Sequence, residues 1–208
     1  WYSVKDKNGN WSEAKNIGRP LNNRENNFVI STSPDNNTLL LGNKYAPDGV
    51  SSNGGGVSIT RKGQSGWEIP KDVIIEDFVN TNSYVGYFLS NDNKNLLMTV
   101  ERPEGFGLKD IYVSFVKEDG TFSKPKSLGN VVNTFEDEAN PFLASDGKTL
   151  YFASKGHPGY GQFDLFVTKR LDDSWTNWTK PENLGNIINS PLYELSIFLS
   201  AKGDKAYI

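Results

Sequence analysis

The sequence predicts an all-β protein built from repeated four-stranded antiparallel sheets, and two observations support this. Within residues 140–185, four short apolar runs are separated by turn-forming residues such as Asp146-Gly147. Asp-Gly between apolar runs is a strong hairpin signal, because the tight turn needs positive φ and glycine adopts it without steric cost. The second observation is that the pattern recurs every 55 or 56 residues. We therefore expect several copies of one small sheet.

The four apolar runs are assigned to four consecutive strands of an antiparallel meander. They cover residues 142–144, 149–153, 164–168 and the stretch from Trp178 toward Gly185. The second run is apolar on both faces, with Leu150 and Phe152 on one and Tyr151 and Ala153 on the other. A sheet with one face in water shows strict apolar and polar alternation. Both faces of this sheet are therefore expected to be covered by neighbouring copies.

An aromatic residue marks the repeat, with steps of 56, 55 and 56 residues between Trp11, Trp67, Phe122 and Trp178. Asn133 and Asn189 keep the same period. Copies of this length with four strands each are typical of propeller blades. We therefore predict a β-propeller in which the repeated aromatic residues pack between blades.

The predicted propeller is a single domain over residues 1–208, with about four blade equivalents. Three blades cover residues 19–74, 75–129 and 130–185. Residues 1–18 match the third and fourth strands of a blade, and residues 186–208 hold a first and a second strand, so the two ends are expected to complete one shared blade. Two interpretations stay open: the ends close a ring of four blades, or the chain is a slice of a larger ring.

The copy in residues 19–74 is the most divergent one. Its strands are expected at residues 28–31, 38–41 and 57–60, and a long glycine-rich connection at residues 43–56 carries Tyr45. A connection of this length is either a mobile loop or a binding loop. The sequence leaves both interpretations open.

Composition excludes several function classes. The 208 residues include no cysteine, which excludes disulfides, thiolate metal sites and thiol nucleophiles. No apolar run approaches the ~18 residues that a membrane-spanning helix needs. The net charge is −3 and basic residues are dispersed, so nucleic-acid binding is not expected, because neutralising phosphates supplies much of that affinity.

Three segments invite a cofactor or metal interpretation. Residues 105–110 and 159–164 share the pattern Gly-x-Gly-x-x-Asp before a strand. A dinucleotide fingerprint would need a following helix and a third glycine, so we predict tight connections with glycines at positive φ and an Asp accepting backbone hydrogen bonds. Residues 6–10 superficially match a calcium loop but are interpreted as a hairpin turn. No cofactor and no metal site are predicted.

The remaining polar candidates lie in loops. Glu136-Asp137-Glu138 is interpreted as a solvated acidic loop, because adjacent residues on an extended chain point to opposite faces and do not form a catalytic pair. His157, the only histidine, is expected at the surface of a Gly-Pro loop without fixed partners. No catalytic residue is predicted. The residues proposed to bind a partner are Tyr45, Glu136, Glu138, His157 and Tyr160.

Residues 144–154 read Ala-Ser-Asp-Gly-Lys-Thr-Leu-Tyr-Phe-Ala-Ser and are followed by a glycine loop and Phe-Asp-Leu-Phe-Val at residues 163–167. This sequence resembles the WD40-like propeller repeat of the TolB type. The longer unit, with Trp-x-x-Pro-x-x-Leu-Gly, is similar to the version found in Bacteroidota envelope proteins, where a peptidoglycan-binding domain of the outer membrane protein A type is commonly attached. The resemblance is strong in residues 130–185 and weak in residues 19–74.

The resemblance implies a periplasmic, outer-membrane-associated scaffold that binds envelope proteins in an assembly, transport or secretion complex. Peptidoglycan association would come only through a domain not present in this sequence. Because no nucleophile and base are recognisable, the expected function is not enzymatic. The alternative is a glycan-binding or glycan-hydrolysing propeller, whose pocket would be lined by acids and aromatic residues. Its candidates are Glu136, Glu138, Asp164, Tyr45 and Tyr160.

Overall fold

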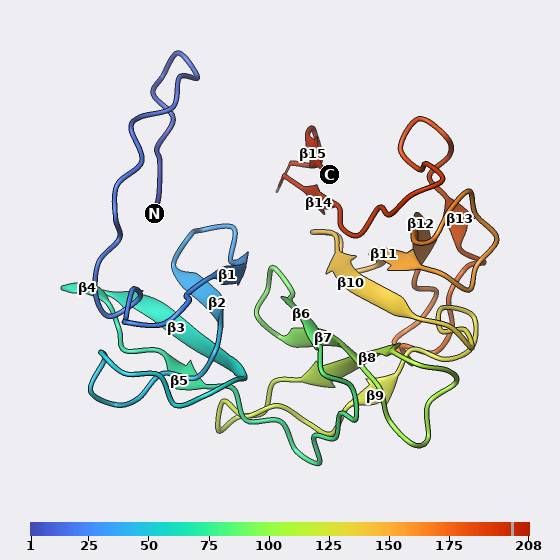
Figure 1. Cartoon of the computed structure of the whole chain (residues 1–208), viewed down its shortest axis with the longest axis horizontal. Coiled ribbons are helices and arrows are strands. Elements are labelled where there is room, and N and C mark those ends of the chain that lie inside the picture. Colours follow the sequence, from blue (N-terminus) through green and yellow to red (C-terminus); the bar gives the residue numbers. More distant parts are fainter. Residues whose placement is uncertain (201) are drawn as a thin grey trace. The chain divides into compact units, whose positions relative to one another are not determined.

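The computed structural model describes residues 1–200 and 202–208, and it divides into two compact units, Trp1–Val73 and Ile74–Ile208. All regular secondary structure in the described residues is β (Figure 1). Consequently, none of these residues belongs to a helix that could span a membrane. The boundary between the units lies one residue from the boundary that the repeat places between residues 74 and 75.

The first unit contains one antiparallel sheet of five strands. These are β1 (Val29–Thr32), β2 (Thr38–Gly42), β3 (Val57–Gly63), β4 (Gly66–Trp67) and β5 (Lys71–Asp72). β2 pairs with β1 and with β3, and both short strands β4 and β5 pair with β3. The buried core beside this sheet is small and consists of Leu21, Leu39, Leu41 and Tyr45.

The second unit contains two four-stranded sheets of the same topology. The first sheet has β6 (Gly86–Leu89), β7 (Asn95–Val100), β8 (Asp110–Phe115) and β9 (Lys126–Ser127); the second has β10 (Glu138–Leu143), β11 (Thr149–Ser154), β12 (Asp164–Lys169) and β13 (Glu182–Asn183). Each sheet pairs its strands antiparallel in chain order. The meander predicted for residues 140–185 is therefore confirmed. A two-stranded sheet follows, formed by β14 (Phe198–Leu199) and β15 (Ala206–Tyr207).

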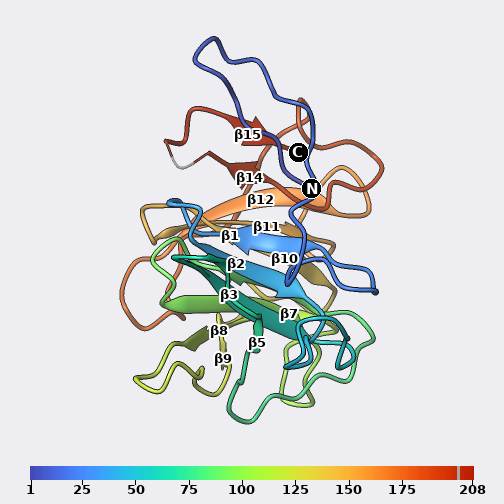
Figure 2. The ribbon, with the colours of Figure 1, turned by 90° about the vertical axis from the view of Figure 1, so that its left-hand side faces the viewer.

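Both faces of the β10–β13 sheet are covered, as the apolar character of β11 predicts. Leu150 and Phe152 belong to a cluster that also contains side chains of β6, β7 and β8. Ala153 belongs to a second cluster with Ile197, which lies just before β14. Figure 2 shows the second unit from its side, with β14 and β15 on one side of β10–β12 and β7 and β8 on the other. Three successive sheets of this unit thus stack through their apolar faces.

The repeated aromatic position is buried in the second unit. Trp178 and Phe122 are 4% and 2% exposed, and Trp178 packs in the cluster between the two four-stranded sheets. In the first unit the prediction is wrong for Trp11, which is 64% exposed. Trp11 belongs to a hairpin bridged at Lys5 and Trp11 that contributes nothing to the core of that unit, and its ring instead faces the Lys5 ammonium at 4.6 Å.

The predicted shared blade combines residues 1–18, which belong to the first unit, with residues 186–208, which belong to the second. Within their own units, residues 1–18 form a hairpin with a bridge between Tyr2 and Lys15, and the end of the chain forms the β14–β15 sheet. No closed sheet is present in the described part of the chain. The shared blade remains a prediction.

Candidate functional site

Four of the five residues proposed to bind a partner lie at one edge of the second unit. The register of the β10–β13 sheet places Glu138 opposite Ser154, and Ser154 opposite Asp164. The loops at this edge, hereafter the loop edge, are residues 102–109, 132–138, 154–163 and 190–194. They meet where β8, β10 and β12 begin (Figure 1). The structure therefore brings together loops from successive copies of the repeat.

A buried aspartate holds each glycine motif of the loop edge. Oδ2 of Asp110 accepts a hydrogen bond from the N–H of Phe106 (2.6 Å), and Oδ2 of Asp164 accepts from the N–H groups of Tyr160 (2.9 Å) and Gly161 (3.0 Å). Both aspartates are buried. The prediction that this Asp accepts backbone hydrogen bonds at the strand entrance is confirmed.

The predicted reason for the glycines is wrong, because none of Gly105, Gly107, Gly159 and Gly161 has positive φ. They are needed for close approach instead. A Cβ at Gly107 would lie 2.4 Å from the Thr134 carbonyl oxygen, and one at Gly161 would lie 2.4 Å from the Ser190 carbonyl oxygen. The loops of successive copies thus pack against each other where a side chain has no room.

Glu138 is fully buried at the centre of the loop edge. Its Oε1 accepts hydrogen bonds from Oγ1 of Thr134 (2.8 Å) and Oγ of Ser154 (2.8 Å), and its Oε2 accepts from the N–H of Thr134 (2.9 Å). Burial raises the pKa of Glu138 to about 7, and the nearby Asp110 charge adds to this, although the three hydrogen bonds favour the charged form. This carboxyl group therefore titrates close to neutral pH.

The solvated acidic loop predicted for Glu136-Asp137-Glu138 is a wrong interpretation for two of the three residues. Asp137 and Glu138 are buried, and only Glu136 is partly exposed. Asp137 lies between two ammonium groups, with its carboxylate 3.8 Å from Nζ of Lys109 and 3.1 Å from Nζ of Lys155. β10 begins at Glu138, and the backbones of Asp137 and Glu138 form hydrogen bonds with Lys155 and Lys109. These bonds bury both acids.

His157 is half-buried, which corrects the prediction of a surface histidine. Its ring lies 5.3 Å from that of Phe166 and 5.8 Å from that of Phe152, and Nε2 is 2.9 Å from the Val132 carbonyl oxygen. Burial lowers the pKa of His157. Tyr160, in contrast, is 53% exposed. Of the candidates at this edge, Tyr160 is the one whose ring is open to a partner.

The loops of the loop edge also carry exposed apolar side chains that sequence reasoning did not select. They are at least 47% exposed: Phe106, Leu108, Phe135, Leu192 and Tyr193. One signal was available, because Phe106 and Tyr160 occupy the same position of the two glycine motifs. Clustered exposed apolar residues mark interaction sites in soluble proteins.

Tyr45, the fifth candidate, belongs to the first unit. It is 4% exposed, its hydroxyl donates to the Leu21 carbonyl oxygen (2.9 Å), and it packs in the core of that unit. The connection around it folds back on itself, since the N–H of Asn43 donates to Gly56 and the N–H of Asn53 donates to Lys44. Tyr45 also lines a hollow of about 430 Å³ together with Pro47, Asn53, Ile69, Pro70, Lys71 and Asp72.

In the part of the chain that the structure describes, no three His, Cys, Asp or Glu side chains are grouped so that they could hold a metal ion. The turn at residues 6–10 is held by Oδ1 of Asp6, which accepts from the N–H groups of Asn8 (2.8 Å) and Asn10 (2.9 Å), with Gly9 at φ 85°. The hairpin-turn interpretation of this segment is confirmed.

No family model matches the chain, and no curated protein matches it. Among solved structures, the chain is similar to a Mycobacterium tuberculosis puromycin-hydrolyzing peptidase, with 16% sequence identity and a TM-score of 0.39 over 75% of this chain. The chain spans 23% of the length of that peptidase. Because that structure is a hydrolase, the prediction that this chain is not an enzyme is withdrawn. A TM-score of 0.39 assigns no activity to the chain.

Proposed function

We propose that the chain is a protein-interaction module of the TolB-type β-propeller class, acting as a scaffold in the bacterial cell envelope. Two features support the propeller interpretation. Successive copies of the repeat form four-stranded meanders of identical topology, and three successive sheets of the second unit stack through apolar faces. Stacked four-stranded meanders are the arrangement expected of neighbouring blades.

The observation that carries the interaction function is the loop edge. It exposes Phe106, Phe135 and Tyr160 on loops whose backbones are tied to buried carboxylates. Rigidly held aromatic side chains contribute most of the affinity in many protein interfaces, because little conformational entropy is lost when they are buried. We therefore assign the partner-binding surface to the loop edge.

The envelope location rests on the resemblance of the repeat to those of Bacteroidota envelope proteins. In that setting the partners are envelope proteins, and the chain works in the periplasm in association with the outer membrane. The glycan alternative has less support. Two of its residues, Tyr45 and Asp164, are buried and already engaged in hydrogen bonds.

The proposal is tested by placing a photo-crosslinking amino acid at Phe135 or Tyr160 and, as a control, at Asp173, whose side chain is fully exposed at the opposite edge of the same sheet. Each variant is irradiated with an envelope fraction. We expect the two loop-edge positions to trap the same protein and the control position not to. The trapped protein is then purified and its affinity for the chain is measured. The double variant F135A/Y160A should bind it at least tenfold more weakly than the wild type, with an unchanged melting temperature.

Equal trapping at Asp173, or unchanged affinity of the double variant, would contradict the assignment of the loop edge. A cell fractionation that places the protein in the cytoplasm would contradict the envelope location.

A further inference from the structure

The loops that carry Phe135 and His157 are connected through one buried carboxyl group. The N–H of Glu136 donates to Oγ1 of Thr134 (3.2 Å), and that hydroxyl donates to Glu138. On the other side, the N–H groups of Gly156 (3.1 Å) and His157 (3.3 Å) donate to Oγ of Ser154, whose hydroxyl also donates to Glu138.

This arrangement assigns every hydroxyl proton. Thr134 and Ser154 accept from backbone N–H groups, so each hydroxyl has its own proton free to donate, and both donate to Oε1 of Glu138. The pattern is complete only for a carboxylate, which accepts and does not donate. A protonated Glu138 would carry a donor that faces two hydroxyls already used as acceptors.

Burial opposes the carboxylate form. Glu138 and Asp110 are both fully buried, and neither has an ion-pair partner within 4 Å among the described residues. The N–H of Glu138 donates to the Lys109 carbonyl oxygen (2.8 Å), which ties the start of β10 in one sheet to the residue before β8 in the other. Oδ1 of Asp110 has no hydrogen-bond partner in the described part of the chain. Two buried, uncompensated carboxylates repel each other and favour taking up a proton.

We propose that Glu138 is a proton-operated latch of the loop edge: as a carboxylate it holds segments 134–136 and 154–157 in one network, and as a carboxylic acid it releases one of them. On protonation the new O–H donates to the oxygen of Thr134 or Ser154. That hydroxyl then no longer donates to Oε1. A backbone N–H of the same segment, which donated to the hydroxyl oxygen, loses its acceptor. The proton comes from solvent, and no covalent bond other than O–H forms or breaks.

The loop edge carries other charged groups besides Glu138. They are Arg102, Glu104, Lys109, Glu136, Asp137, Lys155, His157 and Glu194 in the loops, and Asp110 and Asp164 at the first residues of β8 and β12. Lys109 and Lys155 are both committed to Asp137, so neither neutralises Glu138. The imidazole of His157 contacts the Val132 carbonyl oxygen and not Glu138.

The second copy of the loop provides a matched control. Glu194 accepts from the N–H (2.9 Å) and the hydroxyl (2.5 Å) of Ser190, and the N–H of Leu192 donates to that hydroxyl, as in the Thr134 loop. However, Glu194 is only partly buried, and among the described residues no second hydroxyl donates to it.

The experiment follows backbone amide chemical shifts of the full chain by NMR between pH 4.5 and 8.5. In the wild-type protein we expect the amides of Glu136, Gly156 and His157 to titrate together with a midpoint near 7. The titration should vanish in E138Q and persist in E194Q and in H157Q. D110N should lower the midpoint, because the neighbouring negative charge is gone, and S154A should raise it, because the charged form loses a hydrogen bond.

Independent midpoints for the three amides, or a common midpoint that survives in E138Q, would overturn the latch. If E138Q does not fold, the opposite shifts in D110N and S154A decide the matter, and equal shifts in both would count against it. These readouts involve no partner, so the latch and the proposed binding function are tested separately.

Discussion

Asn133 forms two hydrogen bonds with the backbone of Ile111: its Oδ1 accepts from the N–H (2.8 Å), and its Nδ2 donates to the carbonyl oxygen (3.0 Å). Asn189 makes the same pair of bonds with Leu165, at 2.8 and 3.0 Å. The amide side chain thus pairs with the second residue of β8 and of β12 as a neighbouring strand would. This explains why an asparagine recurs with the period of the repeat.

Replacing this asparagine should be costly. N133A leaves the N–H of Ile111 buried without its acceptor, whereas the Ile111 carbonyl oxygen keeps the hydrogen bond from the Leu128 N–H (3.1 Å). We expect the variant to lower the free energy of unfolding by roughly 1–3 kcal/mol. Urea denaturation measures the change. The control is N91A, which removes one exposed bond to Ser145 (2.8 Å) and should cost less than about 0.5 kcal/mol. Equal effects of the two variants would contradict the structural role of Asn133.

The close approach at Gly107 predicts a steric effect. In G107A the new Cβ would meet the Phe135 backbone and the Thr134 carbonyl oxygen at 2.4 Å, so the loops must separate. We expect a loss of roughly 1–3 kcal/mol in unfolding free energy, typical of overpacking. G55A is the control, since nothing lies within 4 Å of its Cβ and its φ is not positive. Thermal denaturation of G107A indistinguishable from that of G55A would refute the prediction.

Glu138 predicts a pH dependence of global stability. Its folded pKa of about 7 lies above the ordinary value of 4.5, so the folded state binds more protons between these pH values. The free energy of unfolding should therefore fall as pH rises from about 4.5 to about 7, by about 3 kcal/mol from this group. His157, with a lowered pKa, acts in the opposite direction and destabilises the protein as pH falls below 6.5.

The variants E138Q and H157Q separate these two contributions in urea denaturation at pH 5, 6, 7 and 8. E138Q should remove the decline toward pH 7, and H157Q should make that decline steeper. A decline that persists unchanged in E138Q would show that another group is responsible.

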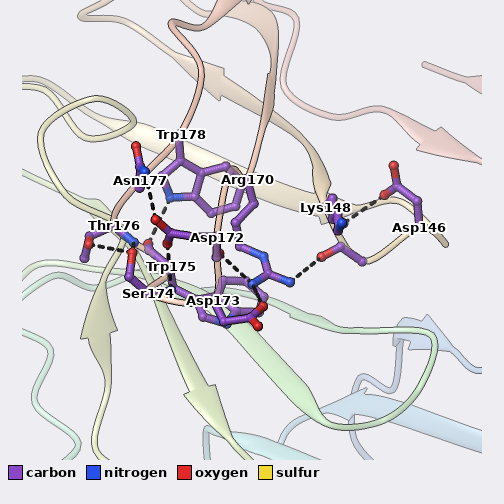
Figure 3. A network of polar contacts seen from close by, with 11 residues as sticks. Asp146, Lys148, Arg170, Asp172, Asp173, Ser174, Trp175, Thr176, Asn177 and Trp178 are labelled. Carbon is purple, nitrogen blue, oxygen red and sulfur yellow. Dashed lines mark hydrogen bonds and ion pairs between the residues drawn. The ribbon is translucent and has the colours of Figure 1, made fainter.

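Arg170 organises the turn at the opposite edge of the β10–β13 sheet (Figure 3). Its Nη1 donates to Asp172 O (2.8 Å) and Asp173 Oδ1 (2.7 Å), its Nη2 donates to Gly147 O (3.2 Å), and its guanidinium lies 4.5 Å from the Trp175 ring centre. A lysine cannot reproduce this planar set of contacts. R170K should therefore lower the unfolding free energy by about 1–2 kcal/mol.

Differential scanning fluorimetry is sufficient to compare R170K with K148A. Lys148 is exposed, and its hydrogen bond to Asp146 is donated by the backbone N–H and not by the side chain. K148A should leave the melting temperature unchanged. A fully stable R170K would mean that charge alone, and not the geometry of the guanidinium, holds the turn.

The accuracy of the sequence-based predictions differed between the fold and the loop edge. The meander at residues 140–185 was predictable because Asp146-Gly147 and the apolar runs act over a few residues. The burial of Glu138 was not, because the donors that satisfy its carboxylate come from Thr134 and from Ser154 on another strand. Likewise, the exposure of Trp11 depends on packing, which the repeat alone does not specify.

The strands, their antiparallel order and the apolar character of both faces of the repeated sheet follow from the sequence alone, because turn chemistry and side-chain alternation are local properties of the chain. The packing of the folded chain was needed to learn which acids are buried, why the motif glycines lack a side chain and which aromatic residues remain exposed at the loop edge. Those outcomes depend on atoms that belong to different copies of the repeat and meet only after the sheets have stacked, and no local pattern records such distances.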